Sequence, residues 1–259
     1  MLERAEYPEN VRRILGEGLA ACALLSATIK FKGSLILQIR GDGPLHLLVV
    51  QATSEGTMRA IARWQGEVPD HDLKSIFGNG QMAITIEPDE GEAYQGVIAL
   101  QGEHLNQALE AYFQQSEQLN TRLWLIADAD ICAGLLLQEM PGDTIDTDAW
   151  QRTTQLASTV TPSELLQLDA DEFLHRLFYA EDVRLFESEP LSFRCNCSRE
   201  RISSILLSLG SKEAPNILEE RGSIEVDCEF CNAHYFFDAV DVEAIFACST
   251  PPKTHNTKH

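Results

Sequence analysis

The chain has 259 residues, of which 40 are acidic and 20 are lysine or arginine, giving a formal net charge of −20 and an isoelectric point near 4.6. This acidic balance disfavours nucleic acid as a partner, because phosphate contacts depend on lysine and arginine. No apolar run reaches the roughly 18 residues of a membrane span, so we expect no segment to cross a membrane. The hydrophobic content of 44% is sufficient for a substantial globular core.

The first half of the chain predicts a helix followed by an antiparallel sheet. Apolar residues recur on one helical face over residues 8–28, and alternating patterns then predict strands at 28–40, 45–52, 57–66, 81–87 and 94–101. A second helix is expected at 105–116, lying on the sheet, and a closing hairpin at 122–127 and 132–140. We therefore expect an α+β domain over residues 1–142.

Glycine-rich turns at 41–44, 54–56 and 78–80 separate these strands. A phosphate-binding loop would need a Lys-Ser/Thr pair or the G-x-G-x-x-G spacing between a strand and a helix, and neither pattern is present. We interpret the three turns as hairpin turns, in which glycine and asparagine tolerate positive φ angles.

Residues 143–190 form a segment of different character, with eleven acidic side chains against three arginines. Two short helices are indicated, one by the capping box Thr161-Pro162-Ser163-Glu164 and the other by Asp169. Their apolar residues need a surface to pack on, because such short helices are marginal alone. We expect an acidic helical linker that docks on the sheet domain; an ordinary connector with a solvated acidic face is the alternative.

Four cysteines near the C-terminus, Cys195, Cys197, Cys228 and Cys231, have the spacing of a zinc site. A Cys-x-Cys pair and a Cys-x-x-Cys pair, thirty residues apart, together supply the four thiolates of a closed, structural tetrahedral shell. We therefore expect one Zn²⁺ per chain, bound by these four residues. Metal binding and folding coincide in such small units, so loss of zinc should unfold residues 191–247.

The residues around this quartet predict how it is held. A strand at 191–193 leads to the first pair, and a helix capped by Ser198 follows it. The helix dipole together with Arg194, Arg199 and Arg201 is expected to offset the thiolate charge. Asn232 occupies a position that favours a left-handed residue, and a strand at 235–237 follows.

Three further cysteines, Cys22, Cys132 and Cys248, are scattered along the chain and are expected to pack in apolar surroundings. An odd number of cysteines in this arrangement fits a reducing cytoplasm better than a secreted disulfide scaffold.

The quartet and its neighbours resemble one family in particular. Cys-x-Cys followed by residues 198–201, and Cys-x-x-Cys with Tyr235 and Phe237 behind it, are similar to the bacterial 33-kDa heat-shock protein family of redox-regulated chaperones. The resemblance extends to residues 41–44, 78–80, 94–96 and 116–119, and so covers nearly the whole chain. Members of that family usually carry an additional segment before the first helix, so we expect Met1 to be an alternative or truncated start.

The resemblance implies an ATP-independent holdase that is inactive while reduced and zinc-bound. Oxidation by hypochlorite, or by peroxide with heat, would form one disulfide between Cys195 and Cys197 and another between Cys228 and Cys231. Zinc would leave, the linker and the zinc domain would unfold, and the subunits would dimerise and bind unfolding client proteins. The tail at 248–259 is expected to be flexible.

Two other classes of function remain open from the residues alone. One is a structural zinc ribbon in a nucleic-acid or translation factor, which the acidic surface disfavours. The other is an enzyme, for example a thiol oxidoreductase using Cys228 and Cys231, but the βαβ setting of that motif is missing, and we expect no enzymatic activity. His234, three residues after Cys231, is a candidate alternate ligand or neighbour of the metal.

Overall fold

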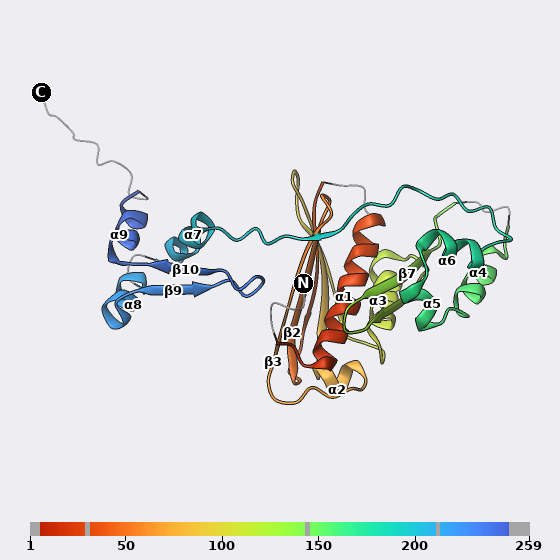
Figure 1. The fold of residues 1–259 in the computed structure, drawn as a ribbon, viewed down its shortest axis with the longest axis horizontal. Helices are drawn as coiled ribbons and strands as arrows, with labels where there is room; N and C mark the ends of the chain where they lie inside the picture. The colour runs from red at the N-terminus through yellow and green to blue at the C-terminus, as the bar shows by residue number, and fades with distance from the viewer. Residues whose placement is uncertain (1–5, 29–31, 143–145, 211–212, 249–259) are drawn as a thin grey trace, which may run out of the picture. The chain divides into compact units, whose positions relative to one another are not determined.

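The computed structural model describes residues 6–28, 32–142, 146–210 and 213–248. It divides the chain into two compact units, residues 1–194 and residues 195–259. Helices and antiparallel strands are mixed in both units, which confirms the α+β class (Figure 1). Within the described ranges, no helix has the length and apolar character needed to cross a membrane.

A six-stranded sheet dominates the first unit, in the order β5-β4-β1-β2-β3-β8. Its members are β1 (Gly33–Arg40), β2 (Leu45–Thr53), β3 (Thr57–Trp64), β4 (Gln81–Pro88), β5 (Tyr94–Ala99) and β8 (Ser192–Phe193). Neighbouring strands are antiparallel, except that β8 pairs in parallel with the first two residues of β3. The five predicted strands are confirmed, although the first begins at Gly33, because Thr28 still belongs to the preceding helix.

The long helix α1 (Glu9–Thr28) lies between this sheet and a separate hairpin of β6 (Thr121–Ala127) and β7 (Cys132–Gln138) (Figure 1). Alternate residues of β1, such as Leu35 and Leu37, are fully buried beneath it, as the period of a strand requires. Gly16 allows the hairpin to approach, because a Cβ atom there would lie 2.6 Å from the Cβ of Ala127. The predicted hairpin is therefore present, but it does not join the main sheet.

One of the three glycine turns is not a hairpin turn. The turn at 78–80 follows a short helix, α2 (Leu73–Phe77), which the sequence pattern does not predict. Gly78 ends this helix with a φ of +67°, and Asp42 accepts a hydrogen bond of 2.7 Å from the backbone N–H of Asn79. The turns at 41–44 and 78–80 are thus bound to each other. The predicted second helix is present as α3 (Leu105–Tyr112), followed by a π-helical turn, η2 (Phe113–Glu117).

The acidic segment forms three helices, α4 (Ala149–Ala157), α5 (Pro162–Gln167) and α6 (Ala170–Leu177). The predicted capping box begins α5, where Thr161 and Glu164 exchange hydrogen bonds. The sequence pattern does not predict α4. Leu135 of β7 is buried together with Ala157, Phe173 and Phe178, so these helices pack on the hairpin and share a small core with it.

The second unit contains α7 (Arg199–Leu209), α8 (Glu213–Arg221), β9 (Ile224–Asp227), β10 (His234–Phe237) and α9 (Ala239–Cys248). Strands β9 and β10 form an antiparallel hairpin. Helices α8 and α9 are not predicted from the sequence. The core of this unit is small and comprises Ile202, Leu206, Ile224, Phe237 and Val242.

Candidate metal centre

The structure brings the four predicted cysteines together. Their sulfur atoms all lie within 4.8 Å of one another. Two pairs across the site are closer, with 3.6 Å between Cys195 Sγ and Cys228 Sγ and 3.3 Å between Cys197 Sγ and Cys231 Sγ. All four residues are partly buried, and none of them forms a disulfide in this structure. The expected grouping of these residues is therefore present in the folded chain.

The second pair lies on a tight turn at the end of the β9–β10 hairpin. The carbonyl of Cys228 accepts hydrogen bonds from the backbone N–H groups of Cys231, at 3.2 Å, and Asn232, at 2.7 Å, while the Cys228 N–H donates to the carbonyl of Ala233. Asn232 has a φ of +57°, which confirms the predicted left-handed residue. This turn holds both sulfur atoms on one side of the backbone.

The first pair precedes the N-terminus of α7. Ser198 caps this helix, because its hydroxyl oxygen accepts a hydrogen bond of 3.2 Å from the N–H of Arg201, as the sequence predicts. Cys197 therefore lies next to the end of the helix where unpaired N–H groups favour negative charge.

The spacing of the sulfur atoms fits a tetrahedral metal ion. Zinc–sulfur bonds of about 2.3 Å imply distances of roughly 3.8 Å between the four sulfur atoms of a tetrahedron. The short contacts of 3.3 and 3.6 Å and the limit of 4.8 Å over the whole set lie on either side of this value. Only a small adjustment of the side chains is required for the four thiolates to bind one ion.

The ionisation of the thiols indicates that the cluster needs a cation to become fully charged. Burial opposes ionisation of Cys197, but hydrogen bonds from the Tyr235 hydroxyl, at 3.2 Å, and from the other thiols lower its pKa to about 7. Burial raises the pKa of Cys231 to about 12 and also raises that of Cys228. The raised pKa values of Cys228 and Cys231 oppose ionisation of the thiols on their own, and four thiolates require a divalent cation to balance them.

Tyr235 is a residue of this site that the sequence pattern does not assign. The pattern places it on a strand, but its contact with Cys197 depends on how the β9–β10 hairpin folds against the start of α7. The period of two along β10 is the signal that could have found it, since Phe237, two residues on, is also turned inward and fully buried.

His234 and Arg199 have other partners than those expected. The Nδ1 atom of His234 lies 2.8 Å from a carboxylate oxygen of Asp227, and this hydrogen bond raises the pKa of the imidazole. His234 is not among the residues that converge on the metal centre. The guanidinium of Arg199 donates to the Phe236 carbonyl at 2.7 Å and forms an ion pair with Asp241. It ties α7 to β10 and α9 instead of facing the thiols directly.

The outlying cysteines are not alike. Cys22 belongs to α1 and is fully buried in the core, as expected, and burial raises its pKa to about 12. Cys132 is exposed at the start of β7, although apolar residues such as Leu19 and Leu24 line the same cavity, so it has apolar neighbours without being buried. The side chain of Cys248 lies outside the described residues.

A family model, related sequences and a solved structure all match this chain, and all belong to one family. Residues 1–238 match the family model described as Hsp33 protein. A protein of Nitrosococcus oceani named 33 kDa chaperonin is 52% identical over 254 residues, covering 98% of this chain and 88% of that protein. A protein of the same name from Pseudomonas fluorescens SBW25 is 45% identical over 267 residues, covering 100% and 89%. The crystal structure of the 33 kDa chaperonin of Thermotoga maritima has a TM-score of 0.82 at 24% identity and covers 95% and 88% of the two chains, which shows the same fold.

Proposed function

The chain belongs to the Hsp33 family, and from this premise we propose that it is a redox-regulated, ATP-independent holdase switched by its four clustered cysteines. The family supports a chaperone role, since the relatives are named chaperonins. The observation that carries the proposed regulation is the convergence of four thiols within 4.8 Å in a unit with a small core.

In the proposed reduced state, Cys195, Cys197, Cys228 and Cys231 bind one Zn²⁺ and keep the chaperone inactive. The four cysteines would hold the ion between the start of α7 and the β9–β10 hairpin, and the ion would supply the positive charge that four thiolates need. Structural zinc contributes roughly 10–16 kcal/mol in small domains at neutral pH. The five buried side chains of this unit supply much less net stability after the entropy of folding is subtracted.

Oxidation removes the ligands. For each disulfide, two thiolates give up two electrons and form one S–S bond, while hydrogen peroxide takes up the electrons with two protons and leaves as two water molecules. We propose disulfides between Cys195 and Cys197 and between Cys228 and Cys231. The shortest sulfur contacts join different pairs, but a tetrahedral cluster keeps every pair near. Peptide mapping of the oxidised protein decides between the pairings.

We propose that the metal-free domain, 191–247, and the linker, 143–190, then unfold, and that the sheet domain, 1–142, stays folded. The apolar surface exposed in this way would bind unfolding client proteins, and oxidised subunits would dimerise. The net negative charge of the linker would keep the exposed form in solution. The cytoplasm is the compartment we propose, because its reducing state would keep the switch off.

The test measures zinc content and suppression of client aggregation on one preparation, before and after peroxide treatment at elevated temperature and again after reductant and zinc are added. We expect one zinc per chain when reduced, loss of zinc as activity appears, and recovery of both on reduction. Cys132→Ser is the matched control and should behave as the wild type. Retention of zinc with unchanged activity would make the quartet a plain structural site, and salt-dependent RNA binding would then favour a zinc ribbon of a nucleic-acid factor.

A further inference from the structure

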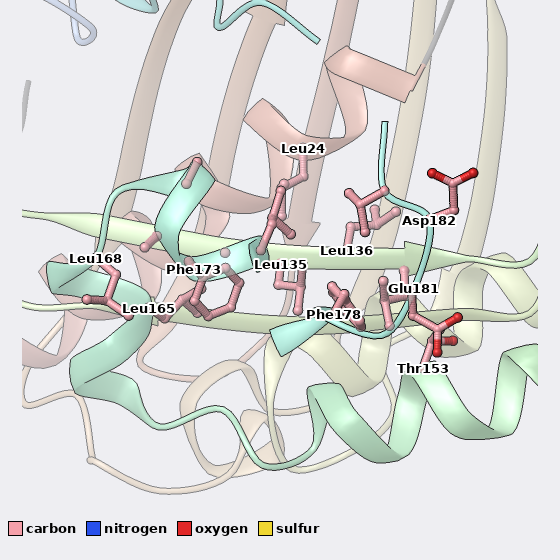
Figure 2. Close-up of a pocket in the computed structure, with 16 residues that line it drawn as sticks. Leu24, Leu135, Leu136, Thr153, Leu165, Leu168, Phe173, Phe178, Glu181 and Asp182 are labelled. Carbon is pink, nitrogen blue, oxygen red and sulfur yellow. The ribbon is translucent and has the colours of Figure 1, made fainter. Parts of the chain in front are cut away.

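A large apolar groove lies between β7 and the linker helices α5 and α6 (Figure 2). Its volume is about 950 Å³, at the upper end of the range of about 300–1,000 Å³ that small-molecule sites occupy. Most of its wall is aliphatic or aromatic. The apolar side chains that line it include Leu24, Leu135, Leu165, Leu168, Phe173 and Phe178.

The two ends of the groove differ in polarity. Figure 2 shows Leu165 and Leu168 at one end and the carboxylates of Glu181 and Asp182 at the other. The polar end follows α6, and the apolar end is formed by α5 and the residue after it. A ligand that fills this groove must therefore be apolar over most of its length and polar at one end.

The polar end carries uncompensated negative charge. Arg152 binds Glu181, with 2.6 Å between Nε and Oε1, and also binds Asp146 at 2.8 Å. Asp182 has no ion-pair partner among the described residues. The three carboxylates of Asp146, Glu181 and Asp182 therefore face a single arginine, Arg152. The charge at this end is complementary to a cation and repels an anion.

We propose that the groove binds an amphipathic organic cation, with an alkyl or aryl body along β7 and α6 and an ammonium group beside Asp182. The apolar body would cover Phe173 and Phe178, whose rings favour contact with aromatic or aliphatic groups. The ammonium group would remain partly hydrated at the open, acidic end and would form a charge-assisted hydrogen bond with the carboxylate.

Such a ligand would bind only while the linker is docked on β7. Leu24 and Leu135 belong to α1 and β7, whereas Phe173 and Phe178 belong to α6 and its end, so undocking separates the two walls. A ligand present at one hundred times its Kd would lower the population of the undocked linker about 100-fold. This regulatory consequence, unlike the binding itself, rests on the proposed function, because it matters only if linker release activates the chaperone.

The binding test uses the reduced, zinc-loaded full chain and three matched probes: 4-phenylbutylammonium, the neutral 4-phenylbutanol and the anionic 4-phenylbutyrate. Isothermal titration should give one site per chain for the ammonium probe, weaker binding of the alcohol and the weakest binding of the carboxylate. Asp182→Asn should weaken binding of the ammonium probe about two- to five-fold, as loss of one exposed charge pair does, and should leave binding of the alcohol unchanged.

Glu187→Gln, a charge change in the same segment outside the groove, is the control for general attraction of cations to this acidic protein. Equal weakening by Glu187→Gln, binding at many sites, or equal affinity for the anionic probe would overturn the proposal. A second experiment measures activation by peroxide with and without the ammonium probe. Slower activation supports the regulatory consequence, while confirmed binding with unchanged activation would count against linker release as the switch and leave the site itself intact.

Discussion

Replacement of Phe173 by alanine should release the linker without oxidation. Phe173 is only 8% exposed and is one of four buried residues that join the linker to β7. Aromatic side chains bury about 150–250 Å², and phenylalanine-to-alanine changes in cores typically cost about 3–5 kcal/mol. A loss of about 3 kcal/mol raises the undocked population by about 100-fold. Because the linker core has only four buried residues, we expect this loss of about 3 kcal/mol to shift a large share of molecules to the undocked form.

The assay compares reduced, zinc-loaded wild type with Phe173→Ala. We expect the variant to be cleaved faster by a protease between residues 146 and 190 and to suppress client aggregation without an oxidant, while one zinc per chain is retained. The matched control is Phe186→Ala, because this phenylalanine belongs to the same acidic segment but is 77% exposed. The control should leave cleavage and activity unchanged.

Three results would refute this reasoning. If Phe173→Ala is cleaved as slowly as the wild type, the small core does not govern linker docking. If cleavage is faster but the reduced variant remains inactive, linker release is not sufficient for client binding. Activity that appears only together with zinc loss would also show that the linker cannot act apart from the metal centre.

Three further predictions concern other parts of the molecule. Cys197→Ser should weaken zinc binding by more than about 100-fold, since loss of a residue that only supports a ligand already costs 10- to 100-fold, and competition with a chelating dye measures it. The hydrogen bond from Arg152 lowers the pKa of Glu181 in the folded protein. The stability that this pair contributes is therefore fully present above the unfolded pKa of about 4.3, and it is lost as pH falls through the lowered folded-state pKa. Protease sensitivity of the linker should rise in acid less steeply in Glu181→Gln than in the wild type. Gly16→Ala should destabilise the first unit by about 1–3 kcal/mol, because the new Cβ would lie 2.6 Å from that of Ala127, and urea unfolding tests this.

Local chemistry made most of the metal centre predictable. Four cysteines in two short pairs define a ligand set by spacing alone, and the cap at Ser198 and the left-handed Asn232 are both determined by neighbours within a few residues. The contact of Tyr235 with Cys197 was not predictable in this way, because it joins residues 38 positions apart and depends on packing of the hairpin.

The difference between local signals and contacts distant in sequence also explains which predictions of the fold were wrong. The strands of the main sheet have clear alternation, so their positions follow from the sequence. The turn at 78–80 resembles a hairpin turn locally, but the short helix α2 before it is held in place by burial of Leu73, Ile76 and Phe77 in the core. The apolar groove could not be predicted either, since its walls come from α1, β7 and the linker helices.

The sizes of the three hydrophobic cores indicate where a conformational switch can operate. Among the residues that the structure describes, the core around α1 and the main sheet contains thirty buried residues, while the linker core contains four and that of the second unit five. Each buried aliphatic or aromatic side chain contributes roughly 1.5–3 kcal/mol before the entropy of ordering is subtracted. The two small cores therefore lie close to the threshold of stability, so that a change of a few kcal/mol can release them, whereas the same change leaves the sheet domain folded. Removal of the proposed zinc ion, whose contribution would be several times that size, would act on the second unit directly, and we predict that the loss of one buried ring is enough to release the linker.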